Sequence, residues 1–177
     1  MSRSSFNSHI APHTLKVASM FSVMSRLKPS GKCDLLTKMK IYNGEDVIEK
    51  GRVKKVDIKD LREEASHEGM SGISTRFIMK SIDCALSDSD KGFITPISIM
   101  DTIAKNCKEQ LANEAFKQEC LTILQDVVRK EYLRILENEI AKAFVAAYEE
   151  QAQSLFENYL DNAEAFAMKA KIKDRIT

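Results

Sequence analysis

The chain has 177 residues and a net charge of +1, with 44% hydrophobic and 30% charged residues. This length can build one good core or two small ones. The near-neutral charge gives no reason to expect a nucleic acid or an anionic membrane as partner, and no apolar run approaches the ~20 residues of a membrane span. We therefore expect no membrane or nucleic-acid partner. The four scattered cysteines offer no small disulfide framework, so we expect a cytoplasmic protein.

The first part of the chain predicts two helices separated by turns. Residues 1–8 are a serine-rich start that we expect to be flexible. A helix should follow over residues 12–27 and end at Lys28-Pro29-Ser30-Gly31. Asp34 is a good N-cap for a second helix that runs to Tyr42. Residues 45–56 are polar and contain a glycine, so we expect a loop there.

The middle of the chain repeats this pattern of caps and turns. In chain order, we expect a helix that starts at Asp57 and ends near Gly69, a helix through about Ser87, a turn over 87–92, a short extended piece at Phe93-Ile94, and a helix from Pro96 capped by Thr95.

The C-terminal half contains no proline after Pro96 and no glycine after Gly92, which predicts helix throughout. Apolar residues recur there every four positions from Cys120 to Tyr148. Such a stripe would drift by about 40° per turn around a straight helix. We therefore expect either burial by successive neighbours or a break near 149–153. A long coiled coil is the alternative, although no heptad is sustained.

The most informative segment runs from Gly69 to Leu86. Two glycines and three hydroxyl side chains precede an apolar helix, and Arg76 lies in its first turn. Free N–H groups and the helix dipole attract anions at such an end, and Ser74 or Thr75 can cap it. On spacing alone, a solvated surface arginine is the simpler interpretation. The functional interpretation is a phosphate contact made by Arg76.

Several sequence blocks together resemble a known family. They are, in order, Ser8-His9-Ile10-Ala11-Pro12-His13-Thr14-Leu15, Lys38-Met39-Lys40-Ile41-Tyr42-Asn43-Gly44-Glu45, Asp60-Leu61-Arg62-Glu63-Glu64-Ala65, Gly72-Ile73-Ser74-Thr75-Arg76-Phe77, Ala143-Phe144-Val145 and Tyr159-Leu160-Asp161-Asn162-Ala163-Glu164-Ala165. The Gly72–Phe77 block resembles the sensor-2 segment of AAA+ ATPases, in the form found in the PrkA family of serine protein kinases. The resemblance extends from about His9 to the C-terminus.

The resemblance implies an all-α fragment of a longer kinase. Residues 9–106 would form a AAA+ lid-like helical domain with a sensor-2 arginine. Residues 107–177 would form a helical connector and the start of the PrkA C-terminal domain. Its partners would be the missing AAA+ core, which binds ATP with Mg, and the C-terminal kinase segment. The nucleotide-binding residues would be Arg76, Ser74 and Thr75.

We predict that this chain is not catalytic by itself. None of its six glycines belongs to a phosphate-binding G-x-x-x-x-G-K-[ST] loop, and H-R-D and D-F-G triplets are absent. We assign no catalytic residue and expect no cofactor on this chain alone. A self-contained kinase using Asp161 with Asn162, or Glu149 with Glu150, is a third hypothesis, but adjacent helical residues do not face one site. The protein substrate and any homo-oligomer are left open.

No metal site is expected. The four cysteines are far apart and form no C-x-x-C pair. His9 and His13 have a spacing that suits a metal on a helix, but Pro12 between them places His9 in a loop.

A second candidate surface lies near the C-terminus. Asn158, Tyr159, Asp161 and Asn162 could contact the missing kinase segment, or they could simply be the outer face of a helix. A stand-alone, non-catalytic helical interaction module is the alternative function. Its support is the short length and the eight methionines, since methionine adapts to partner surfaces.

Overall fold

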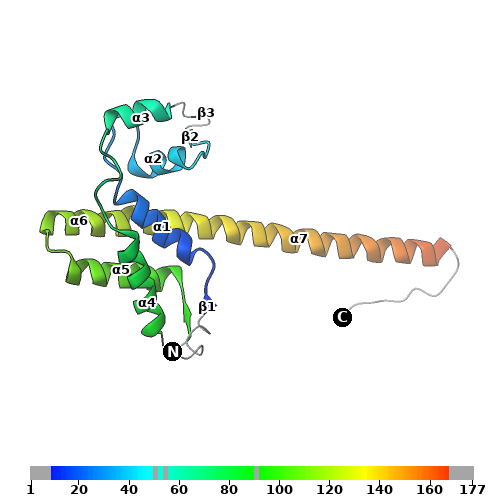
Figure 1. Ribbon diagram of the computed structural model, residues 1–177. Helices are drawn as coiled ribbons and strands as arrows, with labels where there is room; N and C mark the ends of the chain where they lie inside the picture. The colour runs from blue at the N-terminus through cyan, green and yellow to red at the C-terminus, as the bar shows by residue number, and fades with distance from the viewer. Residues whose placement is uncertain (1–8, 50–51, 54–55, 90–91, 168–177) are drawn as a thin grey trace. The chain divides into compact units, whose positions relative to one another are not determined.

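The computed structural model describes residues 9–49, 52–53, 56–89 and 92–167, and its fold is all-α, as predicted (Figure 1). In chain order the elements are β1 (His9–Ile10), α1 (Thr14–Met24), α2 (Leu35–Tyr42), β2 (Ile48–Glu49), β3 (Arg52–Val53), α3 (Ile58–Glu64), α4 (Thr75–Ser87), β4 (Phe93–Ile94), α5 (Pro96–Gln110), α6 (Glu114–Thr122), the π-helical segment η2 (Ile123–Val128) and α7 (Arg129–Ala167).

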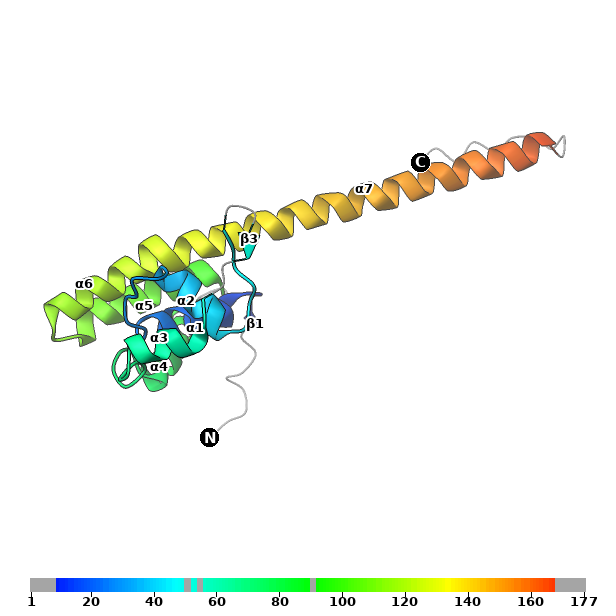
Figure 2. The same cartoon turned by 90° about the horizontal axis from the view of Figure 1, so that it is seen from above.

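The chain divides into two compact units, Met1–Tyr132 and Leu133–Thr177. In the first unit, α1 packs against α4, α5 and η2 around the main core (Figure 2). Phe21 and Met24 of α1 are fully buried in that core. β1 and β4 pair in parallel beside it. A smaller cluster of Cys33, Ile41 and Leu61 holds α2 to α3.

The predicted N-caps are confirmed. Asp34, Asp57 and Ser74 each accept a backbone N–H of the first turn of α2, α3 and α4. Thr95 forms a capping box with Ser98, and Pro96 occupies the first turn of α5. These caps satisfy N–H groups that have no partner inside the helix, which is why short-range sequence signals located them correctly.

Three local predictions in the first unit need correction. α1 begins at Thr14 because His13 adopts a left-handed conformation, with φ of 65°. α3 ends at Glu64, and a turn continues to Gly69. The expected loop over 45–56 contains the antiparallel pair β2–β3, in which Ile48 is opposite Val53.

The predicted break near 149–153 is wrong. α7 is continuous from Arg129 to Ala167, because Glu149, Glu150, Gln151, Ala152 and Gln153 are all good helix formers. The alternative, burial by successive neighbours, is also wrong over the described part of the second unit, where nearly all side chains are exposed. The interruptions lie earlier, at residues 111–113 and in the π-helical turn of η2.

None of the described helices combines the length and apolar character that crossing a membrane requires. α7 is long, but charged side chains are distributed along it.

Gly72 should be the glycine at which substitution is most damaging. Its φ is 109°, and a Cβ there would lie 2.4 Å from the Ser25 carbonyl oxygen. Gly69 has φ of 84° with nothing within 4 Å of such a Cβ. Gly69→Ala should therefore cost only the left-handed penalty of about 1–2 kcal/mol, whereas Gly72→Ala should cost clearly more because α1 and the loop must separate. Urea unfolding of both variants measures the difference, and equal costs would contradict this packing.

Candidate functional site

The N-terminus of α4 is open to an anion. The Ser74 hydroxyl oxygen accepts the Phe77 N–H at 3.2 Å. The N–H groups of Thr75 and Arg76 have no acceptor among the described residues. The Arg76 side chain is exposed and forms no hydrogen bond or ion pair within that part of the chain. A helix start with unpaired N–H groups and a free guanidinium suits a phosphate or carboxylate.

The opposite side of α4 anchors the helix in the main core. Ile73, Ile78 and Ile82 are 2, 7 and 8% exposed, and Phe77 packs against them. Ser81 is also buried and accepts a hydrogen bond from the Asn106 amide of α5 at 2.9 Å. The first turn of α4 is therefore held rigidly while its outer side stays in solvent.

The loop before α4 is fixed to the end of α1. The Arg26 Nε donates to the Ile73 carbonyl at 2.8 Å, and the Ile73 N–H donates to the Ser25 hydroxyl oxygen at 3.1 Å. The Gly69 N–H donates to the Arg26 carbonyl at 3.1 Å. Gly72 allows the two backbones to approach this closely. We call residues 69–73, docked on Ser25 and Arg26, the loop clamp.

A buried ion pair fixes the same loop to α2. The Lys38 ammonium, fully buried, donates to the Glu68 carboxylate at 2.6 Å, and the Tyr42 hydroxyl donates to the other carboxylate oxygen at 2.7 Å. The Lys28 N–H also donates to Glu68 at 2.6 Å. We call Lys38, Tyr42 and Glu68 the buried triad, after its fully buried ammonium; Tyr42 and Glu68 are themselves half-buried.

The buried triad shifts two pKa values. Burial opposes ionisation of Glu68, but the hydrogen bonds from Lys38, Lys28 and Tyr42 outweigh it and hold its pKa below the ordinary value. Burial, followed by the hydrogen bond to the Glu68 carboxylate, raises the pKa of Tyr42 to about 12. Glu68 is thus an anion that keeps Tyr42 protonated.

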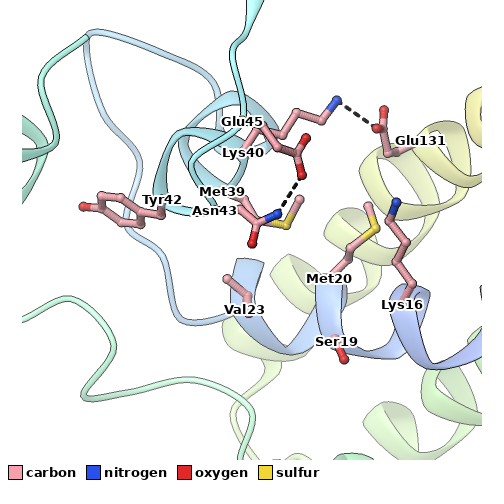
Figure 3. A pocket seen from close by; sticks show the side chains of 10 residues that line it. All are labelled: Lys16, Ser19, Met20, Val23, Met39, Lys40, Tyr42, Asn43, Glu45 and Glu131. Atoms are coloured by element: carbon pink, nitrogen blue, oxygen red, sulfur yellow. Dashed lines mark hydrogen bonds and ion pairs between the residues drawn. The ribbon is translucent and has the colours of Figure 1, made fainter.

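A pocket of about 350 Å³ lies between α1 and α2 (Figure 3). Lys40 of α2 forms an ion pair with Glu131 at 2.8 Å at its edge, and Met20 and Met39 contribute apolar surface. Arg76 does not line this pocket. The sequence did not indicate it, because it depends on the packing of helices far apart in the chain.

The second predicted surface lies on α7, in the second unit. Asn158, Tyr159 and Asp161 are exposed, with Tyr159 at 68%, and Asn162 is half-buried. Their positions on a single helix spread them over almost half its circumference. They form a helical surface, and none of them lines the pocket between α1 and α2. Among the described residues, no group of three or more metal-ligating side chains exists.

The comparisons with known proteins agree on one family. A family model for the PrkA serine protein kinase C-terminal domain matches residues 36–177, and one for the PrkA AAA domain matches residues 1–34. The ATP-dependent protease PrkA of Bacillus subtilis (strain 168) is 38% identical over 171 residues, which cover 96% of this chain and 27% of that protein.

A more distant relative carries a different name. The serine/threonine kinase YeaG of Escherichia coli (strain K12) is 28% identical over 170 residues, covering 93% of this chain and 26% of that protein. This chain therefore spans about a quarter of the length of these curated relatives. No solved structure matches it.

Removing one charge from the buried triad should destabilise the first unit. Glu68→Gln leaves the Lys38 ammonium buried without its counter-charge, and we expect a loss of about 3–5 kcal/mol in the free energy of unfolding. Asp60→Asn is the control, because it breaks the Lys32–Asp60 pair, whose side chains are 47 and 52% exposed, and should change stability little. Similar losses for both variants would contradict the role of burial.

The triad should also produce an alkaline decline in stability. The pKa of Tyr42 is about 12 in the folded protein against an ordinary value of 10.0. A raised folded pKa gives stability that is complete below pH 10 and lost as pH rises toward 12. Guanidinium unfolding across this pH window should show a smaller fall in the free energy of unfolding for Tyr42→Phe than for the native chain. Parallel declines would contradict the assignment.

Proposed function

Because this chain belongs to the PrkA family, we propose that residues 9–106 act as a AAA+ lid-like helical domain that senses ATP through Arg76. In the longer protein, residues 107–177 would connect that lid to the kinase-assigned C-terminal region. The observation that carries the proposal is the free, exposed guanidinium of Arg76 at an open helix N-terminus. The opposite side of α4 is anchored in the core, so the helix end that carries Arg76 is held in a fixed position.

The boundary between the two family matches supports a lid that is packed against the AAA segment of this chain. The AAA match ends at residue 34, after α1, whereas α4 and Arg76 lie within the C-terminal match. Yet α1 packs against α4 and α5 in one core, and the loop clamp bonds its end to the loop before α4. A displacement of α4 would therefore be passed to α1 and to the AAA domain that precedes it.

ATP with Mg²⁺ would be held mainly by residues outside this chain. Arg76 fits one part of such a site, since a guanidinium can bond two phosphate oxygens at once. The Thr75 and Arg76 N–H groups fit as further donors, while the Ser74 hydroxyl supports them as the cap. The described residues include no carboxylate cluster for a metal.

The proposed switch is loss of this contact after hydrolysis. When the terminal phosphate leaves, Arg76 loses its anionic partner, and the lid is released to rotate relative to the core. The loop clamp and the buried triad make the lid move as one body. α7 begins at Arg129 in the first unit and continues as a single helix into the second, which makes it a suitable connector.

A second candidate function is a non-catalytic interaction module. The exposed apolar side chains of α7 favour it, for example Phe144 at 73% and Phe166 at 79% exposed. Surfaces of this kind are typical of protein contacts. The two functions are compatible within one longer protein, and they concern different units.

The test is Arg76→Ala in the full-length protein. We expect ATP turnover to fall about tenfold or more, the effect of losing a charged hydrogen bond worth ~1.5–3 kcal/mol. Arg76→Lys should recover part of it, because it keeps the charge and loses the second donor. ATP hydrolysis, nucleotide affinity and substrate phosphorylation are measured separately.

The matched control is Lys80→Ala. Lys80 is an exposed cation one turn further along α4, and its removal should leave turnover unchanged. If Arg76→Ala matches the native protein in both turnover and nucleotide affinity, the sensor function is wrong.

A further inference from the structure

Large apolar side chains recur every eleven residues along α7. Leu133, Phe144, Leu155 and Phe166 form this series, at 47, 73, 72 and 79% exposed. Eleven residues make close to three turns, so successive members lie only about 20° apart around the helix. The series therefore forms a nearly straight line along one face of the helix.

Two further series fill the gaps on the same face. The second series consists of Glu137, Tyr148 and Tyr159. The third consists of Ile140, Gln151 and Asn162, again at intervals of eleven residues. The three series together advance in steps of four and three residues. We call this set, from Leu133 to Phe166, the eleven-residue stripe. It differs from the four-residue pattern that ends at Tyr148, which would drift around the helix.

The spacing of the stripe is the same read in either direction. Its steps are 4, 3, 4, 4, 3, 4, 4, 3 and 4 residues, so a second copy running the opposite way meets it position for position. We propose that this chain forms an antiparallel dimer in which the eleven-residue stripes of two α7 helices pack together.

The polar members of the stripe favour this direction. In the antiparallel register, Glu137 lies opposite Asn162 of the second copy, and a carboxamide can donate to a carboxylate. Tyr148 lies opposite Gln151, which can also hydrogen-bond. In a parallel register, each Glu137 would face the other Glu137, and two like charges would repel each other in a desolvated seam.

The apolar members also match across the antiparallel seam. Phe144 lies opposite Leu155, and Leu133 lies opposite Phe166. Acidic side chains such as Glu139, Glu157 and Glu164 fall on the far side of the helix, away from the seam. Alanines at 141, 152 and 163 border the stripe and let the two helices approach closely.

The exposed apolar area of the stripe sets the upper limit of what a paired helix can bury, and that limit reaches the size of a stable interface. At ~150–250 Å² for a fully buried aromatic side chain, the exposed apolar members of the stripe offer on the order of 900 Å² per copy. A stable interface needs about 800 Å² per partner. The stripe spans about 50 Å at ~1.5 Å per residue.

The first test is the oligomeric state of the 177-residue chain by sedimentation equilibrium. We expect a dimer at micromolar concentrations. Phe144→Lys with Leu155→Lys should weaken it about a hundredfold or more, since two charges enter the apolar seam. Ala146→Lys with Gln153→Lys is the matched control. It adds the same charges on the opposite face of α7 and should leave the dimer intact.

The fold of each variant is checked by circular dichroism and by thermal unfolding of the first unit, which contains none of these positions. A monomeric native chain would overturn the proposal. It would indicate that another part of the longer protein, or a different partner, covers the stripe. Equal dimerisation of the stripe variant and its control would overturn it as well.

The second test reads the direction of pairing. Phe144→Cys and Leu155→Cys are made as separate variants on a Cys84→Ser background, since Cys33, Cys107 and Cys120 are buried. Under mild oxidation, the antiparallel register predicts a disulfide dimer in the mixture of the two variants and almost none in either alone. Self-linking of Phe144→Cys would instead show parallel pairing and overturn the proposed register.

Discussion

The structure of the first unit depends on how the loop between α3 and α4 is held. Glu68 binds the loop to α2 through Lys38 and Tyr42, and a few residues later Ile73 binds it to α1 through Ser25 and Arg26. These bonds are partly buried, and an unmade bond costs more there than at the open surface. The loop therefore cannot shift without breaking both sets. The direction of the first turn of α4, and so of Arg76, follows from this double attachment.

This attachment also explains why a family boundary can fall inside one structural unit. Residue 34 ends one sequence match, and residue 36 begins the other. Physically the chain has no division there, because α1 shares its core with α4 and α5. The two relatives are named a protease and a serine/threonine kinase. A lid that responds to nucleotide is compatible with proteolysis or with phosphorylation, because the nucleotide is sensed before either reaction on a protein substrate takes place.

Local signals predicted much of the fold, and tertiary packing decided the rest. Ser74, Thr95 and Asp34 cap helices through bonds to neighbours three residues away, so the sequence near each cap is sufficient. The exposed position of Arg76 at the start of α4 agrees with its pattern. The loop clamp could not be predicted, because Gly72 resembles an ordinary turn glycine until α1 is placed beside it. The pocket edge formed by Lys40 and Glu131 joins residues about ninety positions apart.

The error over residues 149–153 has a different origin and leads to a conclusion about α7. The predicted break assumed that the four-residue pattern from Cys120 to Tyr148 would go on drifting around the helix. After Tyr148, the apolar residues instead return to the same face because some steps are of three residues. An apolar line with this period drifts by only about 20° per eleven residues, so two such helices stay in contact along their length through a gentle right-handed supercoil. The lid and the stripe lie in separate units, so each can be altered without changing the other. Loss of nucleotide sensing with an intact dimer, or loss of the dimer with intact sensing, would therefore identify which of the two proposals fails.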